Sequence, residues 1–260
     1  MEEVLMQENI PVLENEEMWS QRVVDENVPS YGQEVQDVQL ISYTQPEQRF
    51  AEDLTELVAF CARVSNPANQ TNKETSEKLI RYLIKHQHWS PLEMVSVCLE
   101  ITTTRDIARQ ILRHRSFSFQ EFSQRYADPT QELDFVLRPA RLQDTKNRQN
   151  SIEIDMVGND EHRYLAYQWE QYQLQLVNKV KEIYTWAVEK GIAKEQARVV
   201  LPEGLTVSRL YMNGTLRSWI HYIQLRSANG TQLEHILIAK KCAEVIAKIF
   251  PMANEFTGKE

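Results

Sequence analysis

The chain has 260 residues, 42% of them apolar and 25% charged, which is enough to form the core of a globular protein. Its 7 glycines stand too far apart to form GxGxxG or GxxxxGK[ST], so the two commonest glycine-rich nucleotide-binding loops are excluded. The net charge of −8 is concentrated in residues 1–37, which hold ten acidic side chains and a single basic one, whereas the remaining residues are nearly neutral. The total charge is therefore no argument against an anionic ligand for the body.

Residues 1–37 are rich in Glu, Gln and Asn and lack hydrophobic periodicity, so we predict an acidic N-terminal extension followed by a single domain over 38–260. The three cysteines have no CxxC or metal-ligand spacing, which is typical of free thiols in a reducing compartment. Because there is neither a signal-peptide pattern nor an apolar run of about 18 residues, we expect a cytoplasmic protein without a membrane partner.

Hydrophobic spacing predicts the secondary structure. Apolar residues recur at i, i+3, i+4 and i+7 within 50–64, as in an amphipathic helix, and alternate with polar ones over 95–101, as in a strand with one buried face. The predicted elements of the first half are a strand over 38–44, helices over 50–64 and 73–85, a strand over 95–101, a helix over 104–114 and a polar and aromatic loop to 129. They are followed by a short strand over 135–137 and a loose polar insertion over about 142–160. The predicted elements of the second half are helices over 164–190 and 193–200, a strand over 205–212, and helices over 216–226 and 233–250. Strands and helices mix without regular βαβ alternation, so the predicted fold class is α+β.

The densest group of polar and aromatic residues lies between Arg113 and Tyr126, in the sequence RHRSFSFQEFSQRY. Five arginines and two acidic residues between 105 and 125 give this stretch a net charge of +3. A solvent-exposed basic face would explain the charge, but not the aromatic residues that alternate here with serines and glutamine. Guanidinium groups bind phosphate and aromatic faces stack on flat rings. The pattern therefore favours a flat, phosphorylated, heteroaromatic ligand.

Other chemistries find less support in the sequence. His86 and His88 form an HxH pair, but no third metal ligand stands at a typical distance and no HExxH motif exists, so no metal site is predicted. Ser123 lacks the GxSxG context of a serine hydrolase. A nucleic-acid binding module could use the arginines and aromatic residues as a stacking platform, but the nearly neutral body disfavours it, and we expect no nucleic-acid partner.

The same cluster carries a specific resemblance. Arg113, His114 and Arg115, followed after seven residues by Ser123, form the signature RHR-x7-S, and the chain resembles the flavin-dependent thymidylate synthases. The fuller pattern RHRxxSxNExSxRY is met at eight of its nine fixed positions, with Gln120 in place of the usual Asn. Matching segments elsewhere are RVS at 63–65, HxSPxE at 88–93, ARQ at 108–110, ARVVLP at 197–202, LRS at 216–218 and LR at 225–226, so the resemblance covers roughly 38–251.

The resemblance implies an antiparallel or mixed sheet with packed helices, the fold of the flavin-dependent thymidylate synthases. It also implies the reaction, in which a methylene group passes from methylenetetrahydrofolate to C5 of dUMP and is reduced by hydride from FAD, which NADPH reloads. The substrates would be dUMP and folate, both small molecules. Proteins of this family are homotetramers whose active sites combine residues of several subunits, so we expect a homotetramer.

Positions that match the family's motifs supply the implied site residues. Those implied to bind FAD are Ser65, His88, Ser90, Arg113, His114, Arg115, Glu121, Thr215, Arg217 and His221. Those implied to bind dUMP are Arg109, Gln110, Arg113, Glu121, Ser123, Gln124, Arg125, Arg198 and Arg226. Asn is usual in the family at the positions of Thr215 and His221, so this chain departs from the pattern there.

The resemblance also implies catalytic roles. Ordinary thymidylate synthase adds the cysteine of a Cys-Pro pair to uracil, whereas none of the three cysteines here precedes a proline. In the flavin enzymes the uracil is polarised instead, and Arg226 is implied to stabilise the negative charge that develops at N3 and O2. Ser123 is implied to position the ring, and His88 with Arg113 to orient flavin and folate. The remaining alternative, a flavoprotein of the same fold without synthase activity, is disfavoured because Ser123, Arg198 and Arg226 are all present.

Overall fold

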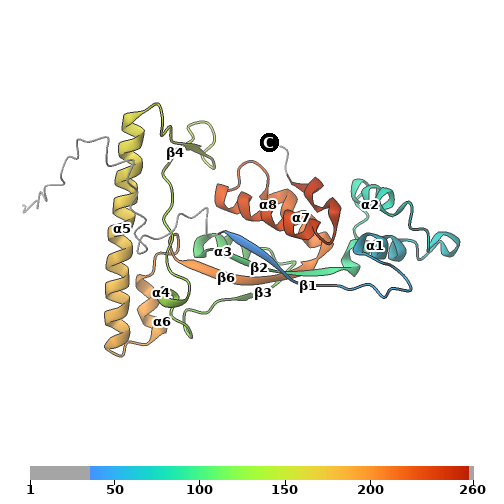
Figure 1. Ribbon diagram of the computed structural model, residues 1–260, viewed down its shortest axis with the longest axis horizontal. Helices are drawn as coiled ribbons and strands as arrows, with labels where there is room; N and C mark the ends of the chain where they lie inside the picture. Colours follow the sequence, from blue (N-terminus) through green and yellow to red (C-terminus); the bar gives the residue numbers. More distant parts are fainter. Residues whose placement is uncertain (1–35, 258–260) are drawn as a thin grey trace, which may run out of the picture.

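A four-stranded antiparallel sheet forms the centre of the molecule, and helices α3, α7 and α8 cover one of its faces (Figure 1). The computed structural model describes residues 36–257. The strand order is β1-β2-β6-β3, with bounds Asp37–Tyr43 for β1, Ser96–Thr104 for β2, Ser118–Glu121 for β3 and Val207–Thr215 for β6. The predicted α+β class and the antiparallel sheet are confirmed.

Strand β2 lies inside the sheet because both its edges are paired and one of its faces is apolar. Val97, Leu99 and Ile101 are fully buried, while the residues between them are only half-buried on the opposite face. Its partner β6 runs antiparallel along its whole length, from the pair Ser96–Thr215 to the pair Thr104–Val207. The two ends of β6 therefore lie at opposite ends of the sheet.

The main hydrophobic core fills the space between the sheet and the helices. Trp219, Tyr222 and Phe250 are among its largest buried side chains. The helices around this core are α1 (Leu54–Ala62), α2 (Ser76–Lys85), α3 (Arg105–Ile111), α7 (Leu216–Arg226) and α8 (Leu233–Ala247), with the short 3-10 helices η2 (Pro67–Asn69), η3 (Ser90–Met94) and η5 (Pro251–Phe256).

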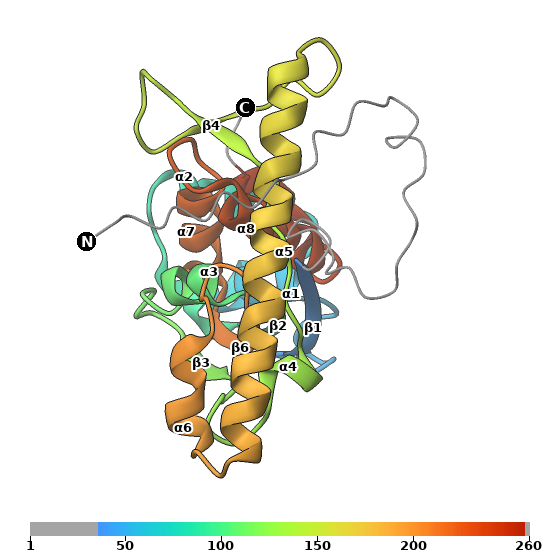
Figure 2. The same ribbon diagram turned by 90° about the vertical axis from the view of Figure 1, so that its left-hand side faces the viewer.

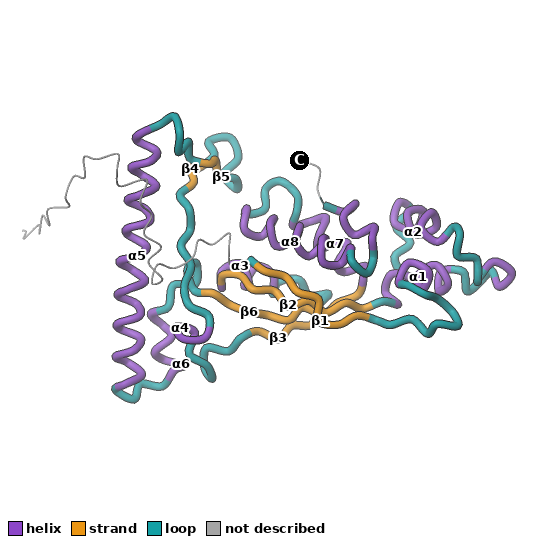
Figure 3. The backbone as a smooth tube through the Cα atoms, viewed as in Figure 1, coloured by secondary structure: helices purple, strands orange, loops and turns teal. Residues whose placement is uncertain are grey.

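A long helix, α5 (Asp160–Glu189), stands beside this body and forms a second, smaller core (Figure 2). Phe135, Val177 and Tyr184 are buried in this second core. The other elements on this side are α4 (Pro129–Glu132), the hairpin β4 (Arg141–Gln143) and β5 (Ser151–Glu153), α6 (Lys194–Ala197) and the 3-10 turn η4 (Arg198–Val200) (Figure 3).

The structure corrects several predicted elements. Residues 118–121 were expected in a loop but form β3, because they pair with β6, which lies far away in the sequence. The segment 135–137 makes an isolated bridge from Phe135 to Thr206 instead of a strand. The expected loose insertion 142–160 is partly ordered, since it contains β5 and most of β4 and reaches the first residue of α5.

The helix ends also differ from the prediction. The helix expected over 193–200 is divided into α6 and η4, and the last long helix ends at Ala247 instead of 250. The predicted acidic extension 1–37 lies almost wholly outside the described residues, so the division into an extension and one domain stays a prediction. Within 36–257, every helix is too short or too polar to cross a membrane.

Candidate active site

Helix α7 connects the two ends of the candidate site. It begins directly after β6, and the hydroxyl of Thr215 accepts a hydrogen bond from the backbone N–H of Ser218 (3.4 Å). Threonine and asparagine are both good N-cap residues, so the replacement of the usual Asn preserves this local function. Arg217, His221 and Arg226 follow along the same helix.

The first turns of α7 contact the segment around η3. Arg217 forms an ion pair with Glu93, and both side chains are roughly 40% exposed. Trp89 packs edge-on against His221, with 4.3 Å between the ring centroids. Burial and the nearby charge of Arg217 lower the pKa of His221. Arg217 and His221, both implied to bind FAD, therefore contact the segment 88–93, which also matches the family's motifs.

His88 and Ser90 stand exposed on either side of this contact, one before and one after Trp89. The rings of His86 and His88 both approach Tyr82, with centroid distances of 4.2 and 6.3 Å. Gln87 between the two histidines adopts a left-handed φ of 60°, so the chain turns sharply from α2 towards η3. In the part of the chain that the structure describes, no group of three or more His, Cys, Asp or Glu could hold a metal ion.

At the other end of α7, Arg226 contacts the signature directly. Its Nε donates a hydrogen bond to Nε2 of His114 (2.8 Å). The His114 ring packs edge-on against Tyr222, with 4.9 Å between centroids. Burial, together with the charges of Arg226 and Arg113, lowers the pKa of His114 to about 4. His114 is therefore neutral at physiological pH, which leaves its Nε2 free to accept this bond.

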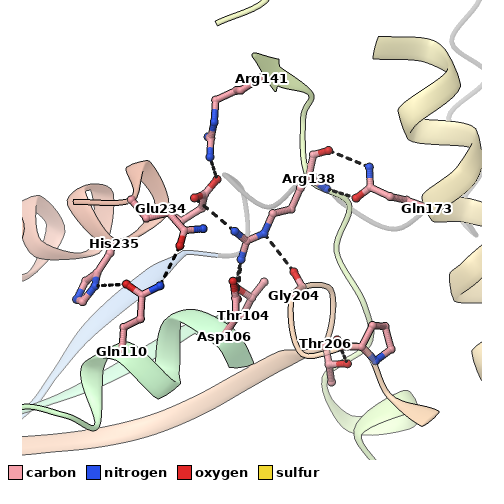
Figure 4. Close-up of polar contacts among 12 residues, drawn as sticks. Thr104, Asp106, Gln110, Arg138, Arg141, Gln173, Gly204, Thr206, Glu234 and His235 are labelled. Carbon is pink, nitrogen blue, oxygen red and sulfur yellow. Dashed lines mark hydrogen bonds and ion pairs between the residues drawn. The ribbon is translucent and has the colours of Figure 1, made fainter. Parts of the chain in front are cut away.

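Gln110 lies on α3 and is hydrogen-bonded at both ends of its amide (Figure 4). Its Nε2 donates to Oε1 of Gln232 (2.9 Å), and its Oε1 lies 3.2 Å from Nδ1 of His235. A residue that the resemblance assigns to dUMP is thus held by the beginning of α8.

Glu121 of β3 points towards the covered side of the sheet. Its Oε1 accepts a hydrogen bond from the Ser208 hydroxyl (2.9 Å) and lies 3.5 Å from Nη1 of the buried Arg105. Gln120, the residue that departs from the signature, is exposed on the opposite face of the strand and is paired in register with Tyr211. The substitution of Asn by Gln therefore affects the open face of the sheet rather than the surroundings of Glu121.

Two arginines lie beside Glu203, which follows the 197–202 segment of the resemblance. Arg109 Nη2 lies 3.1 Å and Arg105 Nε 3.9 Å from Glu203 Oε1. Burial lowers the pKa of Arg105, and the charges of Arg109 and Arg198 lower it further. The surplus of guanidinium groups makes this corner a suitable place for an anion.

The end of the signature forms a turn after β3. The backbone N–H of Arg125 lies 3.4 Å from the Ser123 hydroxyl oxygen, and the Arg125 guanidinium lies 3.4 Å from Glu195. Gln124 is buried, and its Nε2 has no hydrogen-bond partner among the described residues. Such a group is a candidate for contact with a ligand or a second chain.

The remaining implied residues lie apart in the single chain. Ser65 is exposed in the loop after α1, and Arg113 and Arg115 are exposed after α3. The group at Thr215 and the group near Val207 are separated by the length of β6, about 27 Å at about 3.4 Å per residue. The implied residues therefore lie in groups at different ends of the sheet, and these groups do not divide cleanly by ligand, because His114, implied to bind FAD, contacts Arg226, implied to bind dUMP.

The sequence prediction missed a buried ion-pair cluster beside Gln110 (Figure 4). Glu234, only 2% exposed, lies 2.7 Å from Arg141 and 3.4 Å from Arg138. Arg138 also pairs with Asp106 (2.7 Å). The one available signal was an acidic residue followed by a histidine in the apolar first turns of α8, and this signal does not reveal the partners of Glu234.

Comparison with known proteins identifies the family. Residues 36–252 match the family model described as thymidylate synthase complementing protein. The chain is 49% identical over 212 residues to a probable flavin-dependent thymidylate synthase of Paramecium bursaria Chlorella virus 1, covering 82% of this chain and 94% of the viral protein. It is 48% identical over 219 residues to the flavin-dependent thymidylate synthase of a Synechocystis strain, covering 83% and 96% of the two chains.

A solved structure agrees with these sequence matches. The UMP/dUMP methylase PolB from Streptomyces cacaoi, bound with 5-Br dUMP, superimposes with a TM-score of 0.68 at 25% identity, over 85% of this chain and 93% of that chain. The resemblance that rested on the signature is thereby confirmed, and the chain belongs to the family of thymidylate synthase complementing proteins, the flavin-dependent thymidylate synthases.

Proposed function

We propose that this protein converts dUMP to dTMP, with methylenetetrahydrofolate as the carbon donor, FAD as the cofactor and NADPH as the reductant. The observation that carries the proposal is the hydrogen bond from Arg226 to His114, which joins the end of α7 to the signature 112 positions earlier. The names of the relatives support flavin dependence, and the dUMP analogue bound to PolB supports dUMP as the substrate.

The residues where η3 meets α7 fit a flavin nucleotide. Arg217 and the hydroxyls of Ser90 and Thr215 can donate hydrogen bonds to phosphate and ribose oxygens, and His88 and His221 offer flat faces. The ion pair that holds Arg217 is half-exposed and therefore weak, so a phosphate can replace the carboxylate. When bound, the flavin supplies the hydride that reduces the transferred carbon.

The arginines at the other end of the sheet fit the phosphate of dUMP. Arg109 and Arg125 are each paired with a half-exposed carboxylate, Glu203 and Glu195. A phosphate dianion offers a stronger acceptor for the same guanidinium groups. With Arg198 nearby, this set replaces the glycine-rich loop that the sequence lacks.

Arg226 is placed to act on the pyrimidine. Its Nε is held by His114, so its terminal nitrogens remain available for the edge of a uracil ring. Polarisation of the uracil makes C5 nucleophilic and places negative charge at N3 and O2, and a fixed guanidinium stabilises that charge before C5 attacks the methylene carbon. In the same proposal, Ser123 positions the ring and His88 with Arg113 orients flavin and folate.

The environments of the cysteines support a mechanism without a thiolate nucleophile. Burial raises the pKa of Cys242 strongly, and it also raises the pKa of Cys61 and Cys98. All three side chains are therefore thiols at neutral pH, whereas attack on C6 of uracil requires a thiolate.

We also propose that the protein is a homotetramer with shared active sites. The separation of the two residue groups along β6 supports this, because residues of a second chain could complete each group. A second support is the surface of α5, where Leu165, Trp169, Tyr172 and Leu176 recur at helical spacing and are 43–54% exposed. Such a continuous apolar stripe is typical of an interface between chains.

The assembly is tested by light scattering of the full-length protein. Leu176→Glu places a charge in the stripe and should lower the measured mass, because burying an unpaired carboxylate in an interface is unfavourable. Gln175→Glu, on a different face of α5, is the matched control and should keep the mass of the wild type. A wild-type monomer with full activity would contradict the shared sites.

The reaction is tested on purified protein. We expect a yellow protein that forms dTMP from dUMP when NADPH and methylenetetrahydrofolate are present, and a change of its flavin spectrum when dUMP is added. A colourless protein that takes up no added FAD would refute the proposal.

The role of Arg226 has its own test. Arg226→Ala should lose turnover by a factor of about 100 or more, as for other groups that stabilise developing charge, while flavin content stays close to that of the wild type. Arg226→Lys keeps the charge but not the planar donor geometry, so it should restore only part of the rate. Unchanged turnover in Arg226→Ala would remove this residue from the mechanism.

A further inference from the structure

Four side chains form a continuous hydrogen-bonded chain beneath the candidate site. The hydroxyl of Tyr222 lies 3.1 Å from Nε2 of His235, and Nδ1 of His235 lies 3.2 Å from Oε1 of Gln110. Nε2 of Gln110 then donates to Oε1 of Gln232 (2.9 Å). Figure 4 shows the middle of this chain, where the amide of Gln110 on α3 faces His235 on α8.

The direction of every bond in this chain follows from donor and acceptor chemistry. The amide oxygen of Gln110 can only accept, so Nδ1 of His235 must carry the proton. A neutral histidine then has an acceptor at Nε2, which takes the proton of the Tyr222 hydroxyl. The opposite tautomer would place two acceptors face to face at Gln110.

The surroundings keep His235 neutral. The side chain is completely buried, and burial, with the charges of Arg226 and His114, lowers its pKa to about 3. Tyr222 is also buried, which raises the pKa of its hydroxyl and keeps the proton on the oxygen. The donor pattern of the chain is therefore constant across the physiological pH range.

We propose that His235 is a positioning residue that fixes the amide of Gln110 so that one N–H of Gln110 faces the ligand. The carbonyl oxygen of Gln110 is occupied by His235 and one N–H by Gln232, which leaves the second N–H without a partner among residues 36–257. Gln110 then selects a ligand group that accepts a hydrogen bond, such as a carbonyl or phosphate oxygen. This inference rests on the proposed function in one respect, that Gln110 contacts dUMP.

Two amide substitutions separate the two bonds of His235. The amide nitrogen of asparagine and Nδ1 of histidine are separated from Cα by the same number of covalent bonds. The side chain of His235→Asn can therefore still donate a hydrogen bond to Gln110. The amide nitrogen and oxygen of glutamine are separated from Cα by the same number of covalent bonds as Nε2 of histidine. The side chain of His235→Gln therefore keeps the contact with Tyr222 but loses the donor to Gln110. The two variants are alike in polarity and each loses one of the two bonds.

The experiment measures the dissociation constant of dUMP from the flavin spectrum of the full-length protein, together with flavin content and Tm. We expect His235→Gln to weaken dUMP binding about tenfold, the weight of one well-formed hydrogen bond, and His235→Asn to stay within about twofold of the wild type. Equal weakening by both variants, or no weakening by His235→Gln, would overturn the proposal.

A second measurement does not depend on dUMP or on the folding of any variant. Nitrogen NMR of the wild type, with labelled histidine and assigned ring signals, should show the proton on Nδ1 of His235 at neutral pH, as it should for His114, whose Nε2 accepts a hydrogen bond from Arg226. The opposite tautomer for His235 would overturn the inference even if the enzyme is active. A wild type with the expected tautomer but no response to dUMP would instead overturn the proposed function, and with it the ligand that Gln110 is inferred to contact.

Discussion

Mild acid should destabilise this protein through His235. The ordinary pKa of histidine is 6.5, whereas that of buried His235 is lowered to about 3. The pKa of His235 is therefore lower in the folded protein than in the unfolded chain. At a pH between these two values, the imidazole is protonated in the unfolded chain but not in the folded protein. The stability is therefore complete above pH 6.5 and falls as the pH decreases towards 3.

The size of the effect follows from the two pKa values. At pH 5 the unfolded histidine is almost fully protonated and the folded one is not, which lowers the free energy of unfolding by about 2 kcal/mol relative to pH 7. The groups that face His235 do not cancel this effect, since Gln110 has no titrating group, Tyr222 keeps its proton, and the charge of Arg226 already contributes to the lowered pKa of His235. His114, with its pKa near 4, adds a loss of the same sign.

Urea unfolding at pH 7 and pH 5, at one protein concentration, measures this difference. The wild type should lose about 2 kcal/mol more than His235→Asn, which has no titrating ring at this position. His86→Asn, which removes an exposed histidine, is the control and should follow the wild type. If the wild type and His235→Asn lost equal stability, His235 would be protonated in the folded state and the derived tautomer would be wrong.

Two further substitutions test packing and buried charge, each by urea unfolding with a matched control. Glu234→Gln removes the buried carboxylate that pairs with Arg138 and Arg141 and should cost about 3 kcal/mol, whereas Glu182→Gln in an exposed ion pair should cost less than about 0.5 kcal/mol. Gly214→Ala would place a Cβ 2.4 Å from the ring of Phe117 and should cost about 2 kcal/mol, whereas Gly204→Ala meets nothing within 4 Å. Equal losses in a variant and its control would contradict these contacts.

Much of the fold is visible in local sequence patterns. The alternation over 95–101 predicts β2, and the helical spacing over 216–226 predicts α7 with the bounds that the structure shows. These predictions succeed because burial of one face imposes a period of two or of 3.6 on the residues of a single element. The alternation of aromatic and polar residues around β3 also fits a period of two, but from the sequence alone we interpret it as part of a ligand-binding loop, and its pairing with the distant strand β6 is not visible in the sequence.

The sequence by itself determined the family, because the signature places fixed residue types at fixed spacing, and through the resemblance it supplied the predicted residues of the site. Only the tertiary structure showed that Arg226 meets His114, that His235 meets Gln110 and that Glu234 is enclosed by arginines. These contacts join residues up to 125 positions apart, and no local pattern encodes them. These contacts arise because α7 and α8 pack on one face of the sheet and bring polar side chains together in the protein interior. A buried polar group without a hydrogen-bond or ion-pair partner is unfavourable, so these side chains pair with one another.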